Sequence, residues 1–120
     1  MAERGRLYRW PRNRASGDSK SRPVLVLAPD AATRHGRRWV VLPLSTEPGL
    51  AANPLAYRLD PTEVNGLSGT SFVMAWLPTT VLAESLQGPV GRLEAAQVAA
   101  IAGLVIEALD LRCLEPWQET

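Results

Sequence analysis

Two apolar runs in the first half of the chain constrain its fold more than any other feature. Val24–Leu27 lies within the segment SRPVLVLAPD, and Trp39–Leu44 lies within WVVLPLSTEP, with a short polar stretch between them. Continuous apolar runs of this length are typical of strands that are buried on both faces. We therefore predict two neighbouring strands at the centre of the fold.

Each run carries an unusual polar group at one end. Arg22 stands immediately before the proline that opens the first run, and Ser45 and Thr46 follow the second run. If the two strands are neighbours, a guanidinium and a hydroxyl can meet on one patch of surface, which is suited to an anion such as phosphate. Because adjacent side chains on a strand face opposite ways, only one of the two hydroxyls is expected to point into that patch. Ser45 is the favoured residue and Thr46 the alternative.

The other periodic segments predict short strands and one late helix. Ten prolines and nine glycines separate the strands, which favours a small, strongly bent barrel or sheet. From Leu93 the sequence becomes Ala-rich, and apolar residues recur at helical spacing until about Leu111. The expected fold is mainly β with a C-terminal α-helix, an α+β class. Its remaining predicted parts are strands at 7–10, 55–59 and 71–76, a mobile loop at 11–21, a turn at 29–37 and a frayed tail at 113–120.

The charge is divided unevenly along the chain. Residues 1–38 hold ten basic and three acidic side chains, a balance of +7, whereas the remaining 82 residues hold three basic and nine acidic ones, a balance of −6. Twelve of the thirteen basic residues are arginine, whose planar fork matches phosphate. This pattern indicates nucleic acid as the partner of the first half, although a solvated basic face with no fixed ligand would look the same.

Length and composition set further bounds. A chain of 120 residues with 46% apolar side chains suits one domain, residues 1–120. No apolar stretch is long enough for a membrane span, and no apolar segment follows the Arg-rich N-terminus as in a signal peptide. A single cysteine, Cys113, cannot form an internal disulfide. We therefore expect a cytoplasmic protein with no membrane association.

Five segments, taken in order, resemble the MazF/PemK toxins of type II toxin–antitoxin systems. These are RGRLYR, SRPVLVLAPDAATR, WVVLPLST, GLSGTSFVMA and GPVGRLEAAQ, the last followed by the predicted helix. The resemblance covers nearly the whole chain with matching spacing. It implies an SH3-like small barrel of the CcdB/MazF type closed by a C-terminal helix, a homodimer, and sequence-directed cleavage of single-stranded RNA. It also implies a cognate antitoxin as partner.

The resemblance places the catalytic residues on the polar ends of the two runs. Arg22 falls on the family's arginine before Pro-Val, and Ser45 falls on its catalytic hydroxyl, with Thr46 as the alternative. RNA carries its own nucleophile, the 2′-hydroxyl, so the enzyme needs to orient it and to stabilise charge on the phosphate. The implied products are a 2′,3′-cyclic phosphate and a 5′-hydroxyl, and no metal or other cofactor is required.

Further residues are candidates for binding RNA rather than for chemistry. Those of the first loop could contact RNA or belong to an ordinary connector. The segment after the fifth strand departs from the family pattern, and its tryptophan could stack on a base or be buried in the core or at a dimer contact. His35, in a polar turn, is expected to be solvated rather than catalytic. The candidate RNA-binding residues are Arg14, Ser16, Gly17, Asp18, Lys20, Trp76 and Thr79.

Two alternative functions remain open on these residues. A barrel of the same shape serves the CcdB toxins, which bind DNA gyrase and cleave nothing, and a catalytically weak MazF homologue would also keep the fold. The pairing of Arg22 with Ser45 favours the nuclease, whereas the altered segment at 76–80, WLPTT, favours a divergent target.

Overall fold

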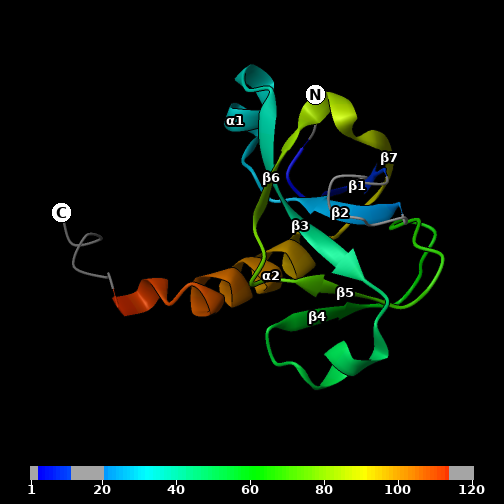
Figure 1. The fold of residues 1–120 in the computed structure, drawn as a ribbon, viewed down its shortest axis with the longest axis vertical. Helices are drawn as coiled ribbons and strands as arrows, with labels where there is room; N and C mark the ends of the chain where they lie inside the picture. Colours follow the sequence, from blue (N-terminus) through cyan, green and yellow to red (C-terminus); the bar gives the residue numbers. More distant parts are fainter. Residues whose placement is uncertain (1–2, 12–20, 114–120) are drawn as a thin grey trace.

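In a computed structural model of the protein, which describes residues 3–11 and 21–113, the strands form an antiparallel sheet with a helix across one face (Figure 1). Most of the predicted loop at 11–21, and the tail beyond Cys113, lie outside the described residues. The elements in chain order are β1 (Arg6–Trp10), β2 (Arg22–Val26), α1 (Asp30–His35), β3 (Arg38–Ser45), η2 (Pro48–Ala52), β4 (Ala56–Leu59), β5 (Ser71–Met74), β6 (Thr79–Leu82), η3 (Ala83–Ser85), β7 (Gln87–Arg92) and α2 (Ala95–Ala108).

Strand β3 organises the sheet. It pairs with β2 along one edge, and along its other edge it pairs with β6 near its start and with β5 near its end. The resulting order is β4-β5-β3-β2-β1-β7, with β6 on β3 alone. The predicted class, mainly β with a C-terminal helix, is confirmed. Among the described residues the sheet is barrel-like without closing, because no pairing joins β4 to β7.

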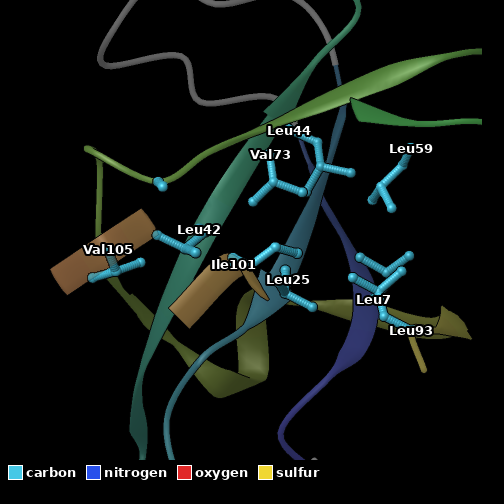
Figure 2. Packing of buried hydrophobic residues seen from close by; sticks show 10 residues of the cluster. Leu7, Leu25, Leu42, Leu44, Leu59, Val73, Leu93, Ile101 and Val105 are labelled. Carbon is cyan, nitrogen blue, oxygen red and sulfur yellow. The ribbon is translucent and has the colours of Figure 1, made fainter. Parts of the chain in front are cut away.

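The main core lies between the sheet and α2 (Figure 2). Ile101 and Val105 of the helix are buried against leucines of β1, β2 and β3, among them Leu25 and Leu42. A second cluster occupies the opposite face of the same strands and includes Val24, Val26 and Val41. Burial on both faces explains why these two strands appear in the sequence as unbroken apolar runs.

Several elements differ from the sequence expectation. The segment predicted as a turn at 29–37 contains the short helix α1, which has Asp30 in its first turn and Arg34 and His35 in its last, charges that suit the helix dipole. Strands β6 and β7 were not predicted. Glycine and proline in β7 (QGPVGR) hide it, and proline is tolerated there because β7 lies at an edge of the sheet.

Helix α2 is shorter than predicted and begins differently. It runs from Ala95 to Ala108 rather than from Leu93 to Leu111. Its N-cap residue is Glu94, whose backbone N–H donates to Gln97 Oε1 at 3.0 Å, as in a capping box. A Cβ added to Gly103 would meet no atom of another element within 4 Å, so none of the described residues packs closely against this position. None of the described helices is both long and apolar enough to cross a membrane.

Candidate functional site

The polar ends of the two central strands meet at one cavity of about 280 Å³. The start of β2 and the end of β3 form most of its wall, since antiparallel strands bring those ends together. The predicted residues Arg22, Ser45 and Thr46 all line it. The lining residues are Ser21, Arg22, Pro23, Leu44, Ser45, Thr46, Glu47, Pro48 and Ser71.

The register of β2 and β3 explains why Arg22 and Ser45 share a face. Val24 pairs with Pro43 and Leu25 with Leu42. Arg22 lies two residues before Val24 and Ser45 two residues after Pro43, so alternation along each strand puts both side chains on the side to which Val24 and Pro43 project. Both side chains are half-buried. A cation and a hydroxyl thus flank one anion-sized space, as the two runs predicted.

The hydroxyl of Ser45 is held by the turn that follows β3. Its Oγ accepts a hydrogen bond from the backbone N–H of Glu47 at 3.2 Å. Because Oγ serves as acceptor there, the hydroxyl proton can be donated to a ligand oxygen.

Thr46 is also among the residues that line the cavity, and the choice between the Ser45 and Thr46 hydroxyls stays a prediction. Strand β3 ends at Ser45, so strand alternation no longer governs the direction of the next side chain. Thr46 is exposed, whereas Ser45 is half-buried.

Glu47 and Ser71 line the cavity but were not predicted from the sequence. Glu47 follows the hydroxyl pair directly and caps the 3₁₀ turn η2, where its Oε1 accepts from the N–H of Gly49 at 3.4 Å. Its position next to Ser45 and Thr46 is the sequence feature that could have identified Glu47 as a site residue. Ser71 comes from β5 and had no local signal, because only the pairing of β5 with β3 brings it there.

The other predicted residues that the structure describes do not line the cavity. Trp76 is half-buried in the turn after β5, so it is not a core residue. Thr79 pairs with Val41, four residues before Ser45, and its Oγ1 donates to Leu77 O at 2.9 Å. His35 is exposed at the end of α1, near the opposite end of β3. The loop candidates Arg14, Ser16, Gly17, Asp18 and Lys20 lie outside the described residues.

A larger cavity of about 570 Å³ lies elsewhere, between the segment Glu3–Arg6 and the first half of α2. It contains none of the predicted catalytic residues. The smaller cavity is the better candidate site because an arginine and several hydroxyl-bearing residues, Ser45 among them, line it together.

Comparison with protein families matches residues 3–109 to a family described as PemK-like, MazF-like toxin of type II toxin-antitoxin system. The comparison with curated protein sequences gave no significant match.

Among solved structures, the Mycobacterium tuberculosis toxin MazF-mt6 is 29% identical with a TM-score of 0.68, and the match covers 88% of this chain and 97% of that one. An endoribonuclease in complex with its cognate antitoxin, from a mycobacterial species, is 23% identical with a TM-score of 0.75 over 92% and 97% of the two chains. MazE–MazF from Deinococcus radiodurans is 22% identical with a TM-score of 0.71 over 91% and 95%. The last two similarities establish the fold alone.

Proposed function

Since the chain belongs to the family of PemK-like, MazF-like toxins of type II toxin–antitoxin systems, we propose that it is an endoribonuclease acting on single-stranded RNA. The observation that carries the proposal is the cavity in which Arg22 and Ser45 lie on the same face of the sheet. Related structures described as an endoribonuclease and as the toxin MazF-mt6 support it.

In the proposed reaction, the 2′-oxygen of RNA attacks the adjacent phosphorus, and the bond from phosphorus to the 5′-oxygen breaks. Arg22 binds the non-bridging oxygens with its fork and offsets the charge that develops on them. Ser45 donates a hydrogen bond from its hydroxyl to a phosphate oxygen and fixes the geometry for in-line attack. The products are a 2′,3′-cyclic phosphate and a 5′-hydroxyl. Each group that takes part in this reaction belongs to this chain or to RNA, except for the water that supplies a proton.

The 2′-hydroxyl proton needs an acceptor, and we assign this role to Glu47. Glu47 is among the residues that line the same cavity, and its described side-chain contact, with the N–H of Gly49, uses Oε1. The 5′-oxygen leaving group takes its proton from water. Histidine is not needed for this scheme, which agrees with the place of His35 at the end of α1, before the start of β3 and remote from Ser45.

The test is cleavage of a long mixed-sequence RNA by purified protein in excess EDTA, with the 5′ ends of the products mapped. Arg22→Ala and Ser45→Ala are each expected to lower the cleavage rate by roughly 100-fold or more, the usual effect of removing a group that stabilises a charged transition state. Thr46→Ala serves as the matched control at the neighbouring hydroxyl and is expected to change the rate only a few-fold.

Undiminished cutting by Arg22→Ala would refute the mechanism. A larger loss in Thr46→Ala than in Ser45→Ala would transfer the catalytic role to Thr46. If wild-type protein arrests growth without cutting RNA, the gyrase-binding alternative would replace the nuclease.

We further propose a cognate antitoxin as partner and a homodimer as the working form, in the cytoplasm where RNA is available. Related structures are described as an endoribonuclease in complex with its cognate antitoxin and as MazE–MazF. The antitoxin segment that suits the basic first half of this chain is acidic and orders on binding.

A further inference from the structure

The candidate site continues across the sheet onto β5 and β4. Ser45 of β3 pairs with Phe72 of β5, and Phe72 pairs with Arg58 of β4. The three residues therefore stand in one row, perpendicular to the strands. A second arginine thus lies two strands away from the hydroxyl that is proposed to bind the scissile phosphate.

All three side chains project to the same side of the sheet. Their chain neighbours Leu44, Val73 and Leu59 point into the main core beneath α2 (Figure 2). Since successive residues of a strand face opposite ways, Ser45, Phe72 and Arg58 face away from that core. This is the face on which Arg22 is opposed to Ser45.

The spacing suits a neighbouring phosphate of the same RNA strand. Adjacent strands lie about 4.8 Å apart, so Ser45 and Arg58 are separated by roughly 10 Å across the sheet at the level of the backbone. Phe72 is 6% exposed, so it fills the interval without offering a charge of its own. Arg58 is thus the next charged side chain beyond Ser45 in this row.

The guanidinium of Arg58 is oriented by its surroundings. Its Nε donates to Asp60 Oδ1 at 3.1 Å, and Thr70 Oγ1 donates to the same oxygen at 3.1 Å. The Arg58 side chain is 63% exposed. Its described contact uses Nε only, which leaves the edge formed by the two terminal nitrogens to a phosphate.

We propose that Arg58 is a second phosphate-binding residue, which contacts an RNA phosphate adjacent to the scissile one, and that Asp60 positions its guanidinium. The proposal rests on the proposed nuclease function. It concerns binding of the substrate strand and gives Arg58 no part in the chemical step. The ligand is the phosphodiester of single-stranded RNA. Because the contact is to the phosphate, it does not depend on the identity of the base.

The experiment measures RNA binding in the Ser45→Ala background, so that the RNA stays intact. A fluorescein-labelled mixed-sequence RNA oligonucleotide is titrated at several salt concentrations, and anisotropy gives the affinity. Arg58→Ala is expected to weaken binding about tenfold at low salt, the usual loss for a hydrogen bond to a charged group. It should also reduce the slope of log affinity against log salt by about 0.7, the value for one phosphate contact to single-stranded RNA.

Arg37→Ala is the matched control. Arg37 is also an exposed arginine in a surface ion pair, with Glu84 at 2.9 Å, but it lies just before β3, at the end remote from Ser45. For Arg37→Ala, the slope of log affinity against log salt should equal that of the parent Ser45→Ala protein. Arg58→Lys should retain the slope while it binds more weakly than the parent, because the point charge remains and the fork is lost.

With Ser45 restored, Arg58→Ala should raise KM for RNA and leave kcat within a few-fold of wild type. A slope for Arg58→Ala equal to that of Arg37→Ala would overturn this inference while leaving the nuclease intact. A kcat loss as large as that of Arg22→Ala would also overturn it, because Arg58 would then act in the chemical step. Failure of wild-type protein to cut or bind RNA would instead overturn the proposed function.

Discussion

Asp60 shows how a single exposed carboxylate can be tuned by its neighbours. Hydrogen bonds from Arg58 and from Thr70 both favour the ionised form, with Arg58 the larger cause, and they lower the pKa of Asp60 below its usual 3.8. A carboxyl whose pKa is lower in the folded than in the unfolded chain contributes stability above the unfolded value. That contribution is lost as the pH falls through the lowered pKa.

We expect an NMR titration of the Asp60 carboxyl in the folded protein to give a midpoint below 3.8. In Arg58→Ala the midpoint should move up toward 3.8, because the principal hydrogen-bond donor has gone. The exposed ion pair Arg37–Glu84 provides the comparison, since Arg37→Ala should leave the Asp60 midpoint unchanged. An identical midpoint in wild type and Arg58→Ala would show that the pair does not persist in solution.

Helix α2 is stabilised at its start and weakened in its middle. The backbone N–H of Glu94 is paired with the side chain of Gln97, so the first turn is capped. Gly103 lies within the helix with open space around its Cα, so nothing in the described structure requires glycine there. Glycine inside a helix costs about 1 kcal/mol relative to alanine.

Gly103→Ala is therefore expected to raise the free energy of unfolding by about 0.5–1 kcal/mol, measured by urea denaturation. Gly91→Ala is the control with the opposite expected effect on stability, because a Cβ there would collide with the backbone oxygens of Asn65 and Val64. That variant should be strongly destabilised. A loss of stability in Gly103→Ala would mean that α2 packs closely against a second copy of the chain at this position.

For the molecule as a whole, the proposed substrate and the proposed antitoxin require the same kind of surface. The cavity with Arg22 and the row that leads to Arg58 both carry guanidinium groups on one face of the sheet. Such a face attracts RNA phosphates and the carboxylates of an acidic segment alike.

We predict that the cognate antitoxin displaces labelled RNA from Ser45→Ala protein in an anisotropy competition. Arg22→Ala should weaken the binding of antitoxin as well as that of RNA, since the variant lacks the guanidinium that both ligands are proposed to contact. Formation of a ternary complex, in which antitoxin and RNA are bound together, would contradict the shared surface. So would a co-complex structure in which the antitoxin leaves Arg22 uncovered.

Periodicity within the sequence was sufficient for most elements. The apolar runs gave β2 and β3, and the helical spacing after Leu93 gave α2, because these patterns reflect local backbone geometry. It failed at α1, where a helix of only six residues resembles a loop, at the four-residue strand β6, and at β7, where glycine and proline obscure the pattern of an edge strand. These short elements depend on contacts made elsewhere in the fold.

The sequence by itself determined which polar residues end the central strands, since Arg22 and Ser45 border the two apolar runs that form β2 and β3. Only the tertiary structure decided which other residues lie beside Arg22 and Ser45. Glu47 enters the cavity through a turn, Ser71 enters through the pairing of β5 with β3, and Arg58 is aligned with Ser45 through two successive strand registers. The physical reason is that register between strands distant in sequence is fixed by which faces pack against the core, and a single strand does not contain that information.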